Sequence, residues 1–321
     1  MQKIVFYVGG GIVIMVGVIF FLMYTASQNT YNSEDENTND TKMNVATTIF
    51  PLYDITRRIA GDKADVQLLL SPGASPHFYE FTPRQINNIK NTDVAFVIGH
   101  GADDWAHDVF TTNNVDVVSV DDRIKLRTSM HQKHDHAGAH EEGHDGDYDE
   151  SIDPHYWLSP NNAILIAQTV ADTLAQKDSN NALAYQQNAQ NFIDELTEIN
   201  DELQSQIQQL SCKDMIVLHG AWYYFAQHFG LDIAGVFMPE TGATPSPQYL
   251  TQLKTATEES CANVIFSEPQ LSTQSIDTFA QDNNLNIAIL DPIGGVSDRE
   301  TYIDLMVYNV NTIINALTNN E

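Results

Sequence analysis

The segment from His131 to Glu150 combines imidazole and carboxylate side chains at a density that suits metal binding. Five histidines and seven carboxylates fall within these twenty residues, and no aliphatic side chain larger than alanine interrupts them. Imidazole and carboxylate are ligands of borderline divalent cations such as Zn²⁺. The segment has almost no apolar surface to bury, so it cannot build a core. It predicts an auxiliary metal-collecting loop, and the alternative is a solvated acidic loop with incidental histidines. The histidines of this predicted loop are His131, His134, His136, His140 and His144.

Four further residues that can bind a metal follow apolar runs or lie in short loops with turn formers. They are His77, His155, His219 and Asp291. Three imidazoles and one carboxylate would close a tetrahedral shell, the geometry that Zn²⁺ adopts with nitrogen and oxygen ligands. A closed shell leaves no bound water to activate, which argues against catalysis. Taken singly, a histidine in a loop is more often a surface or hydrogen-bonded residue than a ligand.

These four residues need a scaffold, and the chain alternates short β-type runs with helix-type segments on both sides of residue 180. Such alternation is typical of a mainly parallel sheet flanked by helices, so we predict an α/β fold of two lobes. Ligands in such sheets sit at the carboxyl ends of strands. The predicted strands are Val45–Ile49, Val66–Leu70, Asp93–Ile98 and Val115–Val120 in the first lobe, and Met215–Leu218, Ile233–Phe237, Val264–Phe266 and Ile287–Leu290 in the second.

The helical periodicity is longest between the two lobes. Residues 180–210 keep apolar side chains at a spacing near 3.6, without Gly or Pro, and would form a helix of about 45 Å. We predict a linking helix over 180–210, a first lobe over 44–179 that contains the loop 131–150, and a second lobe over 211–321. The alternative is a long helix packed on one domain.

The two cysteines, Cys212 and Cys261, lie at matching distances from two apolar runs. Each precedes its run by three residues and precedes a possible ligand, His219 or Glu268, by seven. If the runs are neighbouring parallel strands in register, the cysteines meet at one end and form a disulfide, while His219 and Glu268 meet at the other. The alternative is two buried free thiols.

The N-terminal segment predicts attachment to a membrane. Ile4 to Tyr24 is an uncharged apolar run of 21 residues, about 31 Å as a helix, which is enough to cross a bilayer. We expect residues 1–26 to form an uncleaved anchor with its N-terminus in the cytoplasm, followed by a flexible tether over 27–43. A signal cleaved near Thr25–Ser27 is the alternative. The net charge of −28 argues against nucleic acid as a partner, because phosphate binding needs clustered Lys and Arg.

The ordered motifs along the chain resemble the metal-type solute-binding proteins of bacterial ABC importers, in particular the zinc-uptake branch. The resemblance covers nearly all of residues 44–317. It rests on PHFYEFTP (76–83), DPHYWLSP (153–160), LHGAWYYF (218–225), TPSPQYL (244–250), FSEPQ (266–270) and LDPIGG (290–295). A His-rich insertion just before the DPHYW motif is also similar to the zinc branch. The resemblance implies two lobes joined by a long helix, with a metal clamped between them.

Residue by residue, the resemblance implies that His77, His155, His219 and Asp291 bind the metal. Manganese-type members usually carry glutamate at the position of His219, so the histidine favours zinc. Glu268 is expected near the site, and Glu80 as a competitor for the open coordination position. His100 replaces a residue that is often Asn, and we expect either a near-site role or an ordinary loop residue.

The implied function is capture of Zn²⁺ by a monomeric, membrane-tethered extracytoplasmic protein that is not an enzyme and that passes the ion to an ABC permease. The alternatives are a manganese-binding or adhesin-like homologue and a secreted metallohydrolase. The hydrolase has no HExxH motif to support it.

Overall fold

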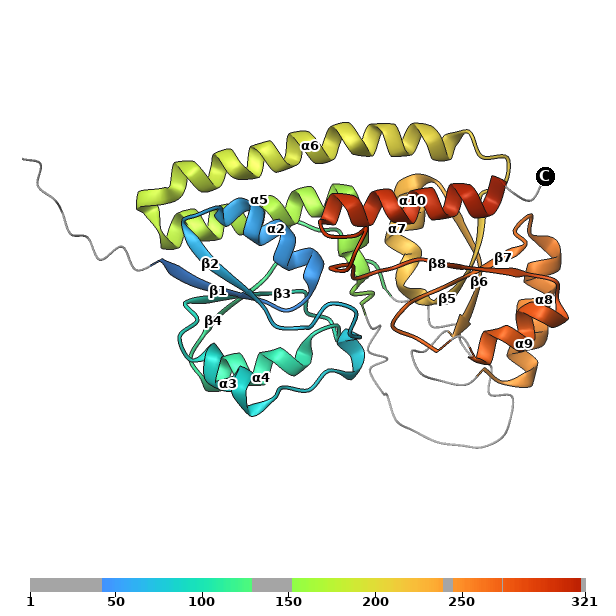
Figure 1. The fold of residues 1–321 in the computed structure, drawn as a ribbon, viewed down its shortest axis with the longest axis horizontal. Helices are drawn as coiled ribbons and strands as arrows, with labels where there is room; N and C mark the ends of the chain where they lie inside the picture. The colour runs from blue at the N-terminus through green and yellow to red at the C-terminus, as the bar shows by residue number, and fades with distance from the viewer. Residues whose placement is uncertain (1–41, 129–151, 239–244, 273, 319–321) are drawn as a thin grey trace, which may run out of the picture. The chain divides into compact units, whose positions relative to one another are not determined.

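The structure is a computed structural model, and the residues that it describes form two four-stranded parallel sheets with flanking helices (Figure 1). The described residues are 42–128, 152–238, 245–272 and 274–318. The segment from Lys42 onward forms one compact unit. The predicted anchor over 1–26, most of the predicted tether and the loop 131–150 lie outside the described residues. Within those residues, no helix combines the length and apolarity needed to cross a membrane.

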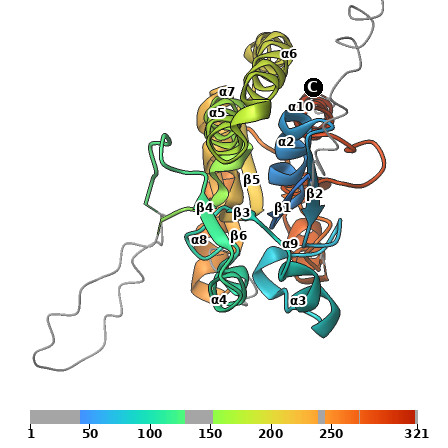
Figure 2. The ribbon, with the colours of Figure 1, turned by 90° about the vertical axis from the view of Figure 1, so that its left-hand side faces the viewer.

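The first sheet has the order β2-β1-β3-β4, and every neighbouring pair is parallel. Successive residues of its strands face opposite sides, as the period of two in a strand requires. Val94 and Phe96 enter the large apolar core, whereas Ala95 and Val97 enter a smaller one. Helices α2 and α5 lie on one side of this sheet, and α3 and α4 on the other (Figure 2). The elements are β1 (Met43–Thr47), α2 (Phe50–Ala60), β2 (Ala64–Leu68), α3 (Pro83–Ile89), β3 (Val94–Val97), α4 (Asp104–Thr112), β4 (Asp116–Ser119) and α5 (Pro160–Lys177).

The second sheet repeats this plan with the order β6-β5-β7-β8, again all parallel. Its central strand β5 is buried along nearly its whole length, which suits the near-continuous apolar run Met215–Leu218. The elements are β5 (Asp214–His219), α7 (Tyr223–Phe229), β6 (Asp232–Met238), α8 (Pro247–Glu259), β7 (Val264–Ser267), α9 (Gln274–Asp282), β8 (Asn286–Ile289) and α10 (Tyr302–Thr318). The predicted α/β class with two parallel-sheet lobes is therefore confirmed.

The long helix α6 (Ala182–Gln208) connects the two sheets and contacts helices of both. Its 27 residues span about 40 Å. It packs against α2 and α5 of the first lobe and against α7 and α10 of the second (Figure 1). Its buried positions recur at helical spacing, as the periodicity of the sequence predicts: Tyr185, Ala189, Phe192, Leu196, Asn200, Leu203 and Ile207.

Among the helices, only the linking helix over 180–210 was predicted with residue bounds. For α8 a signal existed, since Ser246 precedes Pro247 and its hydroxyl accepts a hydrogen bond from the Tyr249 backbone N–H at 3.2 Å. Serine at the N-cap followed by proline at the first helical position marks a helix start. Strand β1 begins at Met43, one residue before the predicted start of the first lobe.

Buried hydrogen bonds tie the two lobes together beside the site. The Trp157 indole N–H donates to the Pro292 carbonyl at 2.8 Å, and the Tyr302 hydroxyl donates to the Trp157 carbonyl at 2.8 Å. Asp54 on α2 accepts from the backbone N–H of Tyr302 at 2.9 Å, so a first-lobe carboxylate caps the start of α10. Because all these groups are buried, leaving any one of them unpaired costs about 1–3 kcal/mol.

We predict that Gly295→Ala destabilises the protein more than Gly73→Ala. Both glycines have left-handed backbones, with φ of +79° and +78°, so the backbone strain of about 1–2 kcal/mol is matched. A Cβ at Gly295 would lie 2.7 Å from the ring of Phe50 on α2, whereas at Gly73 nothing lies within 4 Å. Overpacking adds about 1–3 kcal/mol. Urea unfolding measures both variants, and equal losses would refute tight packing of this loop against α2.

Candidate metal centre

Three imidazoles from both lobes converge in a small cavity. The ring centroids of His77, His155 and His219 lie 5.1–5.8 Å from one another. Each ring offers a nitrogen within 4.8 Å of the other two. Three nitrogens around one Zn²⁺ ion, each at about 2.05 Å, stand about 3.3 Å apart in a tetrahedral arrangement. The three rings therefore need to approach by at most about 1.5 Å to hold an ion.

Local structure brings each histidine to this point. His77 lies in a short 3-10 turn, Pro76–Phe78, in the loop after β2, and His155 opens a second such turn, His155–Leu158, just before α5. Each is preceded by a proline, which fixes the backbone before the ligand. His219 is the last residue of β5, at its carboxyl end. The turns and the strand end thus bring the three histidines together, as expected for candidate ligands of an open parallel sheet.

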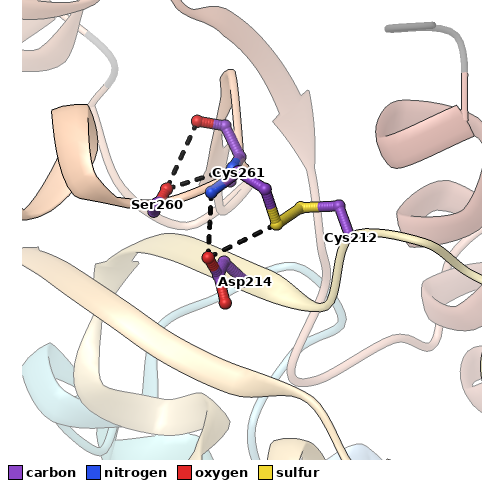
Figure 3. The surroundings of a disulfide bond; sticks show 5 residues. Cys212, Asp214, Ser260 and Cys261 are labelled. Carbon is purple, nitrogen blue, oxygen red and sulfur yellow. Dashed lines mark hydrogen bonds between the residues drawn. A yellow bond between two sulfur atoms is a disulfide. The ribbon is translucent and has the colours of Figure 1, made fainter.

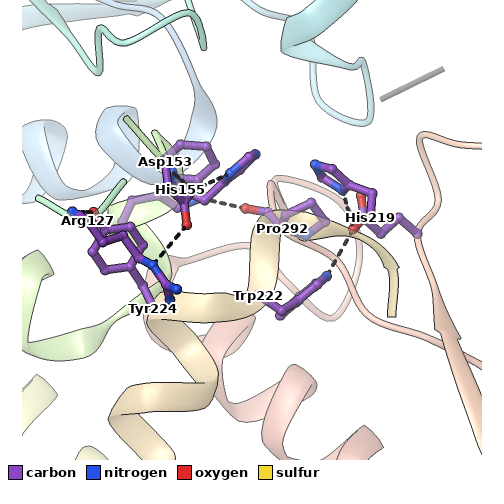
Figure 4. A network of polar contacts seen from close by, with 9 residues as sticks. Arg127, Asp153, His155, His219, Trp222, Tyr224 and Pro292 are labelled. Atoms are coloured by element: carbon purple, nitrogen blue, oxygen red, sulfur yellow. Dashed lines mark hydrogen bonds and ion pairs between the residues drawn. The ribbon is translucent and has the colours of Figure 1, made fainter. Parts of the chain in front are cut away.

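Two of the three rings have their orientation fixed by buried carboxylates (Figure 4). Nδ1 of His155 lies 2.9 Å from Oδ1 of Asp153, and Nδ1 of His219 lies 2.7 Å from Oε1 of Glu268. A carboxylate accepts, so Nδ1 carries the proton and Nε2 presents its lone pair. Among the described residues, neither Nε2 atom has a hydrogen-bond partner, although both are buried. A buried lone pair without a partner is costly unless a ligand satisfies it.

The surroundings lower the pKa of His77 and raise the pKa of His219. Burial, together with the neighbouring rings of His155 and His219, lowers the pKa of His77 to about 4. Burial also acts to lower the pKa of His219, but the charge and hydrogen bond of Glu268 outweigh it, so the pKa of His219 is raised. His77 is therefore neutral at pH 7 and available to a cation, while protons compete for His219 at mildly acidic pH.

Asp291 does not join the three histidines in this structure. Its Oδ1 accepts from the Gln270 side chain at 2.9 Å and from the backbone N–H groups of Ile293 and Gly294 at 3.0 and 3.1 Å. Its Oδ2 faces Arg299 at 3.4 Å. The carboxylate is thus satisfied within its own lobe, and coordination by Asp291 would require it to give up some of these contacts.

The other residues singled out from the sequence fall in different places. Glu268 lines the cavity, whereas Glu80 is exposed and does not. His100 lies outside the histidine group, with Nε2 2.6 Å from Oδ2 of Asp121. Its left-handed backbone, φ +54°, is unusual for a residue with a side chain. The histidines at 131, 134, 136, 140 and 144 lie outside the described residues.

A disulfide joins Cys212 and Cys261 (Figure 3). Cys212 lies just before the start of β5, and His219 ends that strand, so the bridge is at the opposite end of the sheet. The Cα atoms are 5.7 Å apart. Strands β5 and β7 pair in parallel, with Ile216 opposite Ile265, a difference of 49 in residue number. The same difference separates Cys212 from Cys261 and His219 from Glu268, so each pair meets across the two strands. Asp214 accepts from the backbone N–H of Cys261 at 2.9 Å beside the bridge.

Sequence reasoning missed several residues around the ligands. Asp153 orients the ring of His155. The available signal was its position two residues before His155 in the sequence Asp-Pro-His. The buried indole N–H of Trp222 donates to Oε1 of Glu268 at 2.9 Å and so helps to hold the carboxylate that orients His219. Arg127 approaches Asp153 from a separate segment, and Arg299 approaches Asp291 from eight residues further along the same loop. Neither pairing has a periodic signal in the sequence.

Two α/β lobes with a three-histidine centre between them define a metal-binding solute-binding protein. The sequence profile of the family described as ZnuA, the periplasmic component A of a zinc-uptake complex, matches residues 45–316. The chain belongs to this family, whose members are transporter components and not enzymes.

Curated relatives and solved structures agree with this assignment. The high-affinity zinc uptake system protein ZnuA of Bacillus subtilis is 28% identical over 305 residues, covering 92% of this chain and 94% of that protein. A zinc-binding protein AdcA of Streptococcus pyogenes is 26% identical over 289 residues, but the chain spans only 55% of its length. A zinc-bound deletion mutant of ZnuA superposes with a TM-score of 0.74 at 27% identity, covering 86% of this chain and 98% of that one.

Proposed function

We propose that this protein captures Zn²⁺ outside the cytoplasm in the centre formed by His77, His155 and His219 and delivers it to an ABC permease for import. The observation that carries this proposal is the pair of buried Nε2 atoms without hydrogen-bond partners among the described residues, both beside the ring of His77. Membrane tethering through residues 1–26 and a monomeric state belong to the same proposal. The family's description as a periplasmic uptake component supports it.

The donor set favours zinc over manganese. Neutral imidazole suits Zn²⁺, whereas Mn²⁺ prefers more carboxylate oxygen and a larger shell. Glu268 and Asp153 place two carboxylates just outside the shell, where both are engaged with Nδ1 atoms of the proposed ligands. Their negative charge favours a dication held by three neutral imidazoles, and Arg127, 3.9 Å from Asp153, offsets part of that charge.

Asp291 remains our proposed fourth ligand, and to bind the ion it would have to leave some of its present contacts. Arg299 and Gln270 compete with the ion for its oxygens. If Asp291 coordinates, Asp291→Asn weakens zinc binding; if the fourth position is taken from solvent, the affinity stays within about twofold. Isothermal titration distinguishes the two.

Removing residues 131–150 is expected to leave one tight zinc site and to abolish only weaker ones. In our proposal this segment holds the ion loosely and raises its effective concentration near the histidine centre. Titration calorimetry of the deletion variant and the parent gives the number of sites and their affinities. Loss of the tight site in the deletion variant would contradict this division of roles.

Zinc binding is expected to weaken as the pH falls from 7.5 to 6, because the raised pKa of His219 lets protons compete above the ordinary value of 6.5. In Glu268→Gln the carboxylate is gone, so burial is opposed only by the charge of Asp153 and the pKa of His219 falls. That variant should bind zinc about 10–100-fold more weakly at pH 7.5 yet lose less affinity on acidification. A steeper pH profile in the variant would contradict this role of Glu268.

The whole proposal is tested by metal content and transport. A chain starting at Lys42, which forms a compact unit, should carry one tightly bound zinc after purification. The full chain should restore growth in zinc-poor medium to a bacterium that lacks its own zinc-binding uptake component and has the matching permease. A protein with no bound metal and no affinity for zinc would refute it.

A further inference from the structure

Arg127 joins the segments that carry His155 and His219, although it contacts neither ring. Its Nε lies 3.9 Å from Oδ2 of Asp153, and its guanidinium carbon lies 4.4 Å from the ring centroid of Tyr223. Its backbone N–H donates to the Tyr224 hydroxyl at 2.9 Å (Figure 4). The Arg127 side chain is three-quarters buried. The guanidinium is restrained by stacking on the aromatic rings and by an ion pair with Asp153 that has no hydrogen bond.

Asp153 connects this arginine to the metal centre. Its Oδ1 accepts from both the backbone N–H and the Nδ1–H of His155, at 3.1 and 2.9 Å. Its Oδ2 is buried and has no hydrogen-bond partner among the described residues, so the Arg127 cation is the group that balances it. The backbones also pair, since the Asp153 N–H donates to the Arg127 carbonyl at 3.0 Å. A movement of Arg127 would therefore turn the carboxylate that orients His155.

The aromatic partners of Arg127 belong to the other lobe. Tyr223 and Tyr224 begin α7, immediately after the 3-10 turn Gly220–Trp222 that follows His219. The segment 219–224 thus supplies one metal ligand and the surface on which Arg127 rests. The position of the Arg127 guanidinium relative to Asp153 therefore depends on the position of α7 in the second lobe.

We propose that Arg127 is a positioning residue of the metal centre, which couples the placement of α7 to the orientation of His155 through Asp153 and so slows metal release. This inference rests on the proposed function, and it adds a determinant of how long the ion stays bound. It also predicts that the effect needs the shape of the guanidinium and not its charge alone, because one group must reach the carboxylate and lie over the Tyr223 ring.

A purely electrostatic role would have the opposite sign. A cation near a dication repels it, so removing the charge of Arg127 would tighten zinc binding if charge alone mattered. Lysine, which keeps the charge, would then behave like arginine. Positioning predicts weaker retention in both variants, because lysine has a single compact ammonium that does not reproduce the fork of arginine.

The test compares Arg127→Met, Arg127→Lys and Tyr223→Leu with the unchanged full chain. We expect zinc dissociation, followed by a chelator chase, to be about tenfold faster in Arg127→Met, the lower end of the range for groups outside the coordination shell. Arg127→Lys and Tyr223→Leu should change the rate in the same direction. The control is Arg123→Met, since Arg123 forms an exposed ion pair with Asp172 elsewhere on the protein. Dissociation that is unchanged or slower in Arg127→Met overturns the proposal.

A second measurement separates positioning from general destabilisation and from failure of zinc binding itself. Arg127→Met leaves the buried Asp153 carboxylate unpaired and should also lower the unfolding midpoint. The comparison therefore includes the Cys212→Ala/Cys261→Ala variant, which should be destabilised at the far end of the sheet. In the metal-free proteins with ¹⁵N-labelled histidine, the Nδ1–H of His155 should exchange with solvent faster in Arg127→Met than in the cysteine variant. If the unchanged chain binds no zinc, the proposed function fails, and this exchange rate still decides the positioning role. An exchange rate equal to that of the unchanged chain refutes it.

Discussion

Replacing His219 by alanine is expected to weaken zinc binding by a factor on the order of 10²–10³. Zinc sites with four protein ligands are worth about 10–16 kcal/mol, so each ligand contributes roughly 3–4 kcal/mol. His219 is 5% exposed, and its Nε2 has no other partner among the described residues, so the variant leaves a gap in the shell. It also removes the partner of the buried Glu268 carboxylate. Competition with a chelator of known affinity measures the loss.

Two other histidines provide matched controls for this substitution. His107 on α4 is exposed, and His228 on α7 is partly buried, with Nε2 2.6 Å from Oδ1 of Asn200. Neither belongs to the group of three. Alanine at His107 should leave both stability and zinc affinity unchanged, and alanine at His228 should lower stability with little effect on affinity. A comparable loss of affinity at either position would show that the three histidines are not the site.

A second substitution at His219 tests the selectivity of the site for zinc over manganese. His219→Glu keeps a ligand but exchanges nitrogen for oxygen, which Mn²⁺ prefers. The variant should bind zinc less tightly than the parent and manganese more tightly, although the adjacent Glu268 carboxylate opposes a second negative charge. Parallel titrations with both ions give the ratio of affinities, and an unchanged ratio would count against His219 as a ligand.

Removing the disulfide is expected to cost about 4 kcal/mol of folding stability without affecting zinc affinity. The bridge closes a loop with a sequence separation of 49, and the chain-entropy model assigns about 4 kcal/mol to a loop of that length. Cys212 lies seven residues before His219, a distance of roughly 23 Å along an extended chain. The two ends of β5 should therefore respond independently.

The experiment uses the Cys212→Ala/Cys261→Ala double variant, and its denaturation midpoint should fall well below that of the parent. The parent treated with a thiol reductant should unfold at a midpoint close to that of the variant. Zinc titration of both folded proteins should give the same affinity. If affinity falls together with stability, the bridge shapes the site as well as the sheet.

The paired spacing of the cysteines and the candidate ligands is a property of the amino-acid sequence alone. An offset of 49 residues separates both Cys212 from Cys261 and His219 from Glu268, and β5 and β7 pair at that same offset. The pattern works because parallel strands in register keep a constant residue difference along their length. The apolar runs that marked the strands, and the period of 3.6 that marked α6, are likewise local properties of the chain.

The position of Asp291 could not be read in the same way. Its type and its place at the end of β8 both indicated a ligand, yet the structure engages its oxygens with Arg299, Gln270 and two loop N–H groups. Competition for a carboxylate depends on which donors the packing brings within reach, and Arg299 arrives through a loop that has no periodic signal. The contact between Arg127 and Asp153 likewise had no periodic signal in the sequence.

By itself, the sequence determined the alternation of strands and helices, the residue types able to hold zinc, and the register that places His219 beside Glu268. These follow from periodicity and chemistry carried by neighbouring residues. Only the tertiary structure decided that His77 and His155 meet His219, that Nε2 rather than Nδ1 faces the common point, and that Asp291 is held back. The meeting of the histidines depends on contacts between segments far apart in the chain. The other two outcomes depend on which nearby donors and acceptors the fold brings within reach of His155 and Asp291, where burial and competing hydrogen bonds select one arrangement among many that the sequence allows.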